Sequence, residues 1–338
     1  MRIFLDAMGG DNAPQAPVAG ALEALRRFPR LEIVLAGDPA AIEPLLKDGE
    51  DVRSRLTVLD APEVITNHES PVMGVRRKTK SATVIGMLQL RDKEVDGFVS
   101  AGSTGAVLAG GMFRLGRIPG IERPALAPLL PNGKGNFLLI DCGANVDCQA
   151  DWLNQFAVMG SAYMESVMGI ANPRVGLINI GAESEKGNAL VKAAYPLMER
   201  APYNFVGNVE AREAVEGSVD VIVADGYSGN IFLKTMEGTG LFLAREIKKI
   251  FKQNLLTKLA AVMVSGGLKR FKKLMDSSEV GGTALVGISK TVIKAHGSSN
   301  AYAFQNAIRQ ASQSVSSGLI ENITANIDLM RLDAPEKE

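Results

Sequence analysis

The stretch VDGFVSAGSTGAVLAGG, residues 95–111, is the part of the sequence that decides the fold. Its apolar start over residues 95–99 predicts a short buried strand, and residues 100–106 predict a Gly/Ser/Thr turn leading into a helix of small residues. The N–H groups of such a turn and the dipole of the following helix can hold a phosphate or an oxyanion without a metal. Glycines are also common in strand-to-helix turns that bind nothing, so the motif alone leaves both interpretations open.

Strands and helices alternate along the chain, which predicts an α/β fold with a mostly parallel sheet and helices on both faces. Apolar runs predict further strands over residues 2–5, 31–35, 56–59, 137–140, 174–180, 219–224 and 291–294. Helical spacing predicts helices over residues 14–27, 70–90, 152–168 and 190–200, and another that ends near residue 314. Residues 116–135 are expected to form a Pro/Gly-rich connection with an apolar run, and the residues after 332 a frayed tail.

The composition is that of an ordinary globular protein. With 338 residues, 46% of them hydrophobic, the chain can bury a sizeable core, and we expect one αβα domain over residues 1–338. Lys plus Arg equals Asp plus Glu at 37 each, which argues against broad nucleic-acid binding. The spacing of Cys142 and Cys148 suits neither a redox pair nor a zinc site and favours a reducing compartment. Neither a signal peptide nor a membrane-spanning segment is recognisable, so a cytoplasmic location is expected.

Three predicted strands end in an aspartate, at Asp6, Asp141 and Asp225, and glycine and then asparagine follow each of them. Because ligands of open α/β sheets bind outside the carboxyl ends of the strands, these loops and the 100–106 turn are expected to line one crevice. Three carboxylates could hold a divalent metal there. We favour the simpler interpretation that each aspartate accepts hydrogen bonds from its own loop and fixes the turn.

Residues 241–275 differ from the rest of the chain in charge. The segment contains nine basic residues and one acidic residue, which gives it a net charge of +8. Apolar residues recur between the basic ones at helical spacing. Residues 255–264 are unusually apolar, and Gly266 and Gly267 are expected to break the helix before a second basic piece. Such a helical pair suits an anionic membrane surface or an acidic protein partner, and the alternative is a hairpin packed at a dimer interface.

Two smaller features remain open on the sequence alone. The basic run at residues 76–80 lies inside a predicted helix, where a solvated face is favoured over an anion site. His296 begins a second Gly/Ser turn, and a lone histidine there can be structural or can belong to an anion site.

Seven motifs, spread in order over nearly the whole chain, resemble those of the bacterial phosphate acyltransferase family. They are DAMGGDNAP at 6–14, RRK at 76–78, SAGSTGA at 100–106, DCGAN at 141–145, IGAESEKGN at 180–188, DGYSGNIFLK at 225–234 and KAHGSS at 294–299. The chain departs from the family pattern at Ala182, where an acidic residue is expected, and at GGTALVG over residues 281–287, where a run containing proline is typical.

The resemblance implies a function, a fold and partners. Members of the family convert acyl-[acyl carrier protein] and inorganic phosphate to acyl phosphate and free carrier protein, which feeds glycerophospholipid synthesis. It further implies a three-layer αβα fold with a mostly parallel central sheet, like that of phosphotransacetylases and isopropylmalate dehydrogenases, usually as a homodimer. A projecting basic amphipathic helical pair, matching residues 241–275, is implied as the element that contacts the membrane or the carrier protein. No metal and no nucleotide cofactor are expected. The acyl phosphate is expected to pass to a membrane glycerol-3-phosphate acyltransferase, which implies peripheral membrane association.

The resemblance also implies roles for individual residues. Lys186 would neutralise charge on phosphate or on the developing oxyanion, and the Asn230 amide would donate to that oxyanion. The ordinary alternatives are that Lys186 is a surface lysine of a loop and that Asn230 is the N-cap of a helix. Phosphate would be held by Gly9, Gly102, Ser103, Thr104, Gly105, Asn145 and His296. The membrane or the carrier protein would be contacted by Lys248, Lys252, Leu255, Leu256, Val262, Lys269 and Arg270.

Two other functions compete with this interpretation. A dehydrogenase or kinase is disfavoured because residues 102–105 form GxxG rather than GxGxxG, and residues 132–136 lack the spacing of a P-loop. The other is a non-catalytic scaffold at the membrane surface, which would bind carrier protein through the basic segment and form no acyl phosphate. No nucleophile-elbow motif is present, in keeping with direct attack by phosphate, which is itself a nucleophile.

Overall fold

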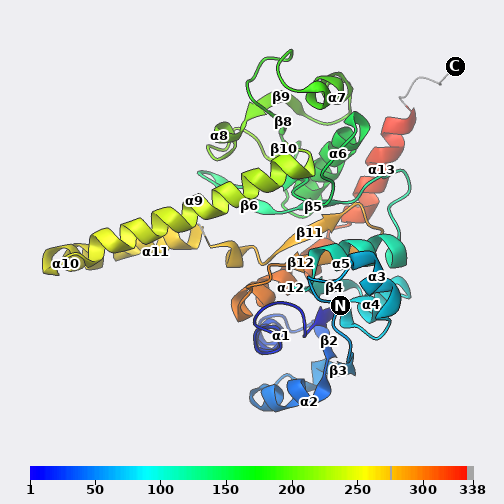
Figure 1. The fold of residues 1–338 in the computed structure, drawn as a ribbon, viewed down its shortest axis with the longest axis vertical. Helices are drawn as coiled ribbons and strands as arrows, with labels where there is room; N and C mark the ends of the chain where they lie inside the picture. Colours follow the sequence, from blue (N-terminus) through cyan, green and yellow to red (C-terminus); the bar gives the residue numbers. More distant parts are fainter. Residues whose placement is uncertain (275, 333–338) are drawn as a thin grey trace.

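The strands form two sheets in the computed structural model, which describes residues 1–274 and 276–332 (Figure 1). The first sheet has the order β3-β2-β1-β4-β12-β11-β5, and the second has the order β6-β7-β10-β8-β9. The strands of the first sheet are β1 Arg2–Asp6, β2 Glu32–Gly37, β3 Leu56–Asp60, β4 Gly97–Ser100, β5 Ala125–Ala127, β11 Gly282–Val286 and β12 Thr291–Ala295. Those of the second are β6 Leu129–Asn132, β7 Gly135–Ile140, β8 Val175–Asn179, β9 Phe205–Glu210 and β10 Val221–Val223.

The predicted mostly parallel α/β architecture is confirmed. Pairing is antiparallel where β11 meets β12 and β5 and where β6 meets β7, and the remaining pairs are parallel. Residues 116–135, expected to be a connection, contain β5 and β6, between which the chain passes from one sheet to the other at Pro128. A proline cannot donate to a strand ladder, which explains why the pairing changes there.

Helices cover both faces of the sheets. They are α1 Gln15–Arg27, α2 Pro39–Ile42, α3 Pro71–Arg77, α4 Ala82–Arg91, α5 Thr104–Gly110, α6 Ala150–Ser166, α7 Ala189–Glu199, α8 Ala211–Ala214, α9 Gly226–Lys252, α10 Leu255–Met263, α11 Ser265–Leu274, α12 Ala301–Ser316 and α13 Leu319–Leu332. Successive side chains of β1 point to opposite faces, so Ile3 and Leu5 join the hydrophobic cluster of α1 and α12, while Phe4 joins the cluster of α4. Each cluster also contains side chains from the second sheet, so the two sheets share their cores.

The helix predicted over residues 70–90 is in fact two helices, α3 and α4. The break lies at residues 78–81, where the Ser81 hydroxyl accepts a hydrogen bond from Val84 N and caps the second helix. Arg76, Arg77 and Lys80 are exposed, in keeping with a solvated face, while Lys78 pairs with Glu69 at 2.6 Å.

Residues 241–274 of α9, α10 and α11, which we call the helical arm, project from the body of the molecule (Figure 1). The helix breaks at Val264, between α10 and α11, and Gly266 and Gly267 lie inside α11, so the predicted break at the two glycines is displaced by two residues. The helices of the described chain include none with the length and apolar character needed to span a membrane. Met275 and the predicted frayed tail after residue 332 lie outside the described residues.

Candidate functional site

The carboxyl ends of β4, β7 and β12 surround a cavity of about 390 Å³ beside the first turns of α9, which we call the strand-end cavity. Thr104 follows β4, Gly143 follows β7 and His296 follows β12, while Asn230 lies on α9. The wall therefore brings together residues that are far apart in the sequence. This meeting of loops at one edge is what parallel strands predict.

The Gly turn after β4 lies directly against the loop after β1. The Ser100 hydroxyl donates to the Asp6 carboxylate at 2.7 Å and accepts from Gly102 N at 2.9 Å. A Cβ atom on Gly9 would lie 2.6 Å from Gly102 N, so only glycine allows the two loops to approach this closely. Met8 N also donates to the buried Asp6, and burial raises the pKa of this carboxyl above its usual value.

The other residues of the predicted phosphate turn have distinct places. Ser103 precedes α5 and makes no capping hydrogen bond through its side chain, and Thr104 lines the strand-end cavity. Gly105 packs against Pro71, where a Cβ atom would come within 2.6 Å of the proline ring. The turn is thus held from both sides by α3 and the loop after β1.

Asn230 is on the wall of the strand-end cavity and exposed to it. The ordinary role considered for it, the N-cap of a helix, belongs instead to Asp225, whose carboxylate accepts from both Ser228 N and Ser228 Oγ at 2.8 Å. A Cβ atom on Gly143 would lie 3.8 Å from Asn230 Cγ, so the loop after β7 borders this amide closely.

His296 lies on the same wall with one ring nitrogen already used. Its Nδ1 accepts from Ser298 N at 3.2 Å and lies 2.8 Å from Ser298 Oγ. Since Nδ1 accepts a backbone proton, the neutral ring carries its own proton on Nε2, where it can donate to a ligand.

Lys294 was missed by sequence reasoning, although it begins the KAHGSS motif. It lines the strand-end cavity but is only 8% exposed, and its ammonium donates to the carbonyls of Ala101 and Ala295. Burial lowers the pKa of this amine to about 8, while the nearby Asp6 and Asp11 act against that shift. A lysine inside the short, largely buried strand TVIKA is the signal that could have identified it.

Asn145 and Asp141 hold the loop after β7 in place. The buried Asp141 carboxylate accepts from four backbone N–H groups, those of Leu126, Cys142, Ala144 and Asn145. The Asn145 side chain donates to Pro124 O and to Asp141, so both of its amide protons are engaged within the loop. The interpretation that Asp6, Asp141 and Asp225 each fix their own turn is confirmed by these bonds.

Neither metal chemistry nor a thiol nucleophile is suggested by the wall. Among residues 1–274 and 276–332, no three His, Cys, Asp and Glu side chains are grouped to hold a metal ion. Cys142 lines the strand-end cavity, but burial raises the pKa of its thiol well above the usual value. A thiol that stays protonated is a poor nucleophile.

Lys186 lies apart from the strand-end cavity wall, in the loop that follows β8. Its ammonium pairs with Glu183 at 2.8 Å, and both side chains are about half exposed. Asn179 donates to Lys186 O at 3.0 Å and Asn208 donates to Glu183 O at 2.9 Å, so the loop backbone is held at two points while the ion pair faces solvent. The structure thus does not bring Lys186 into the group formed by Thr104, Asn230 and His296.

The basic and apolar residues predicted to contact a membrane or a partner lie on the helical arm. Leu255, Leu256 and Val262 of α10 are 81%, 79% and 69% exposed, although they are large and apolar. Lys248 and Lys252 border the groove between α9 and α11, and Lys269 is exposed on α11. Arg270 differs from these residues, since it lines a cavity at the base of the arm.

Comparison with known proteins agrees with the family that the sequence motifs resemble. The model of the family described as "Fatty acid synthesis protein" matches residues 1–322. A phosphate acyltransferase of Thermoanaerobacter pseudethanolicus is 47% identical over 330 residues, 98% of each chain. A phosphate acyltransferase of Brevibacillus brevis is 45% identical over 337 residues, which is 99% of this chain and 100% of that protein.

Solved structures with a similar fold are much more distant in sequence. A phosphotransacetylase from Streptococcus pyogenes has a TM-score of 0.61 at 18% identity and covers 94% of both chains. A branched-chain phosphotransacylase from Enterococcus faecalis has a TM-score of 0.55 at 13% identity and covers 93% of this chain and 99% of that one. At such identities the likeness concerns the fold, and it is the full-length sequence relatives that carry the conclusion: this chain belongs to the phosphate acyltransferase family.

Proposed function

We propose that this protein transfers the acyl group of an acyl-[acyl carrier protein] to inorganic phosphate and releases acyl phosphate and the free carrier thiol. The observation that carries the proposal is the strand-end cavity, where the Gly turn, Asn230, His296 and the buried ammonium of Lys294 meet. A cavity with several N–H donors and a buried positive charge suits an anion such as phosphate. The names of the full-length relatives support an acyl group as the other substrate.

The reaction needs no nucleophile from the protein. A phosphate oxygen attacks the thioester carbonyl carbon, the tetrahedral oxyanion collapses, and the C–S bond breaks as the thiolate of the carrier arm leaves. What the enzyme supplies is proximity of the two substrates and donors for the oxyanion. Cys142, the thiol on the wall, is kept protonated by its burial, which favours this direct route over an acyl-enzyme.

The site residues form two groups, one that holds the phosphate and one that stabilises the tetrahedral oxyanion. Gly9, Gly102, Ser103, Thr104 and Gly105 shape the phosphate site, although Gly102 N is itself engaged by the Ser100 hydroxyl. In this proposal Lys294 supplies the fixed positive charge beneath the turn and His296 Nε2 adds a donor. Asn145 contributes indirectly by ordering the loop after β7, because its amide protons are already engaged.

Asn230 and Lys186 act on the oxyanion. The Asn230 amide is free of the helix cap and lies on the wall, where it can donate to the carbonyl oxygen as charge develops. For Lys186 to reach the substrate its side chain has to leave Glu183. Exposed ion pairs contribute little to stability, so an anionic substrate can replace this partner at small cost.

The helical arm supplies the contact with an anionic membrane surface and with carrier protein. Its exposed apolar tip on α10 is flanked by basic residues of α9 and α11, the arrangement of a surface-bound amphipathic segment. Leu241 and Phe242, lower on α9, are 67% and 53% exposed and suit the interface of a homodimer. An enzyme held at the membrane in this way would pass acyl phosphate to a membrane glycerol-3-phosphate acyltransferase.

The test is to incubate the purified protein with palmitoyl-[acyl carrier protein], with and without inorganic phosphate, and to trap acyl phosphate with hydroxylamine. Phosphate-dependent hydroxamate together with free carrier thiol is the expected result. Carrier binding without hydroxamate, from a folded protein, would contradict the proposal and favour a scaffold.

A further inference from the structure

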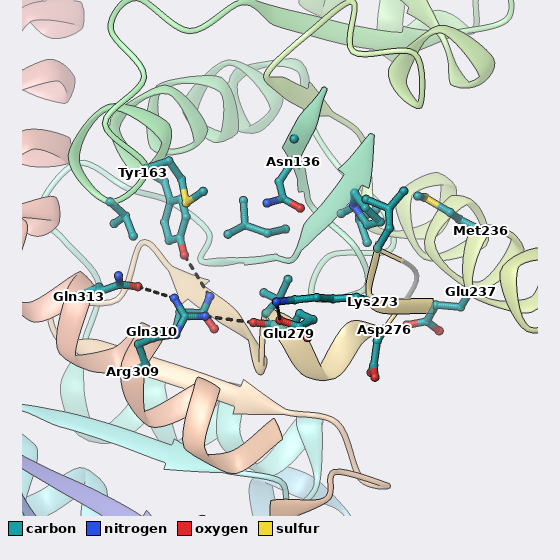
Figure 2. Close-up of a pocket in the computed structure, with 18 of the residues that line it drawn as sticks. Asn136, Tyr163, Met236, Glu237, Lys273, Asp276, Glu279, Arg309, Gln310 and Gln313 are labelled. Atoms are coloured by element: carbon teal, nitrogen blue, oxygen red, sulfur yellow. Dashed lines mark hydrogen bonds and ion pairs between the residues drawn. The ribbon is translucent and has the colours of Figure 1, made fainter. Parts of the chain in front are cut away.

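A second cavity, of about 550 Å³, adjoins the strand-end cavity and is drawn in Figure 2. We call it the neighbouring cavity. It is enclosed by β6 and β7, the end of α6, α12 and the bases of α9 and α11. Leu129, Leu130, Glu237 and Val280 belong to the walls of both cavities, so the two spaces lie side by side along β6 and α9.

The wall of the neighbouring cavity is largely apolar. Its apolar and aromatic side chains are Leu129, Leu130, Pro131, Tyr163, Val167, Met168, Met236, Leu274 and Val280. A cavity of this size with such a lining is typical of sites for apolar ligands. No other group in the proposed reaction needs such a lining, because phosphate belongs with the donors of the strand-end cavity.

The charged side chains of the wall are of both signs and equal in number. Three are acidic and three are basic, namely Glu237, Asp276, Glu279, Arg270, Lys273 and Arg309. Lys273 lies 3.7 Å from the Glu279 carboxylate, and Arg309 donates to Glu279 O at 3.0 Å (Figure 2). Glu237 is paired outside the wall with Lys234 at 2.7 Å. Because acidic groups lie among the basic ones, this wall lacks the concentrated positive charge that a phosphate site needs.

The inner end of the neighbouring cavity is fixed and neutral. Tyr163 is fully buried, and its hydroxyl accepts a 3.0 Å hydrogen bond from Gln310, which is 3% exposed (Figure 2). Burial raises the pKa of the Tyr163 hydroxyl, so it stays uncharged. Val167 and Met168 follow from the same helix end and add apolar surface.

From these shared walls and this lining we infer that the neighbouring cavity holds the acyl chain of the thioester while the carbonyl carbon stays beside Asn230. The inference rests on the proposed function and adds the place of the chain to it. Asn230 and Glu237 are seven residues apart on α9, which is about 10 Å along a helix. A short acyl chain therefore ends before Met236, whereas a long chain passes it and fills the space up to Tyr163.

The test compares butyryl- and palmitoyl-[acyl carrier protein] as substrates for two variants of α9. Met236→Trp places a large side chain in the neighbouring cavity, whereas Thr235→Trp, the matched control, places it at an exposed position outside both cavities. Met236→Trp is expected to lower kcat/KM for the palmitoyl substrate by at least about tenfold and to leave the butyryl substrate within about twofold, since each excluded methylene costs binding. Thr235→Trp is expected to change neither.

An equal loss for both chain lengths in Met236→Trp, or no loss for either, would overturn this assignment. If the wild-type protein makes acyl phosphate from neither substrate, the proposed function itself fails, and the two failures are therefore distinguishable.

A measurement that needs no variant supports the comparison. Palmitoyl-[acyl carrier protein] with a diazirine at the end of the chain is expected to label the peptide that contains Tyr163, Val167 and Met168 on irradiation. Label on α10 of the helical arm would place the chain elsewhere and overturn the inference.

Discussion

The Ser100 hydroxyl donates a 2.7 Å hydrogen bond to the buried carboxylate of Asp6 and so joins the end of β4 to the end of β1. The two residues are 94 positions apart in the sequence. The same hydroxyl accepts from Gly102 N, so a single side chain fixes the aspartate loop and the Gly turn relative to each other. The shape of the proposed phosphate site therefore depends on this bond.

Replacing Ser100 should destabilise the protein. Ser100→Ala leaves the buried Asp6 carboxylate and Gly102 N each short of a partner, and we expect the free energy of unfolding to fall by about 1–3 kcal/mol. Urea denaturation measures this. Ser103→Ala is the matched control, because the Ser103 side chain makes no capping bond, and it should change stability by less than about 0.5 kcal/mol. Equal stability of the two variants would contradict the structural role of Ser100.

Lys294 should make phosphate binding dependent on pH. Its pKa is lowered to about 8 by burial, so the ammonium is present below that pH and lost above it. We expect the KM for phosphate to rise as the pH increases through about 8 and to rise on the order of tenfold in Lys294→Met at pH 7. Lys294→Arg keeps its charge and should show a flat KM over the same range.

The same shift has a consequence for stability. Because the folded protein releases this proton more readily than the unfolded chain, Lys294 should make the free energy of unfolding rise between about pH 8 and the ordinary lysine value of 10.5.

A wild-type KM for phosphate that stays constant from pH 7 to pH 9 would show that Lys294 does not hold the phosphate.

Asn230 should affect turnover and not stability. Asn230→Ala removes one oxyanion donor, and we expect kcat to fall on the order of a hundredfold with the KM for phosphate little changed. Asp225→Ala is the informative contrast, since it removes the true N-cap of α9 and should cost about 1 kcal/mol of stability. A normal kcat in folded Asn230→Ala would exclude this residue from the reaction.

Lys186 should be required although it lies outside the strand-end cavity wall. Lys186→Ala is expected to reduce kcat on the order of a hundredfold or more, because it removes a positive charge from the developing oxyanion. Glu183→Gln removes the partner of Lys186 and should leave the rate at least as high as in the wild type, since the ammonium is then free. Near-normal turnover of a folded Lys186→Ala protein would mean that the ion pair is merely a feature of the loop.

The tip of the helical arm should be needed for membrane binding. The double variant Leu256→Asp and Val262→Asp places two negative charges on the exposed face of α10 and should release the protein from anionic vesicles in co-sedimentation. Val206→Asp, at a 45% exposed position on β9, is the control and should still bind. If the double variant binds as well as the wild type, the tip packs against protein rather than lipid.

The sequence predicts the α/β alternation well because short apolar strands and capped helices are local signals. It does not predict the division into two sheets, since the strands around Pro128 are only three and four residues long and resemble a loop. The break between α3 and α4 was likewise hidden, because it depends on the cap that Ser81 provides.

The proposed site was partly predictable for a similar reason. Strand ends meet at one edge of a parallel sheet, so the grouping of Thr104, Asn230 and His296 follows from topology. The use of Asn145 in its own loop and the burial of Lys294 depend on packing between distant segments, which local patterns do not contain.

The most direct measurement of the central claim uses inorganic phosphate labelled with oxygen-18 and palmitoyl-[acyl carrier protein]. If phosphate oxygen attacks the thioester carbon, mass spectrometry should find acyl phosphate that retains every labelled oxygen, with one free carrier thiol for each molecule formed. Unlabelled free fatty acid as the only product would mean that water, not phosphate, accepts the acyl group, and would contradict the account.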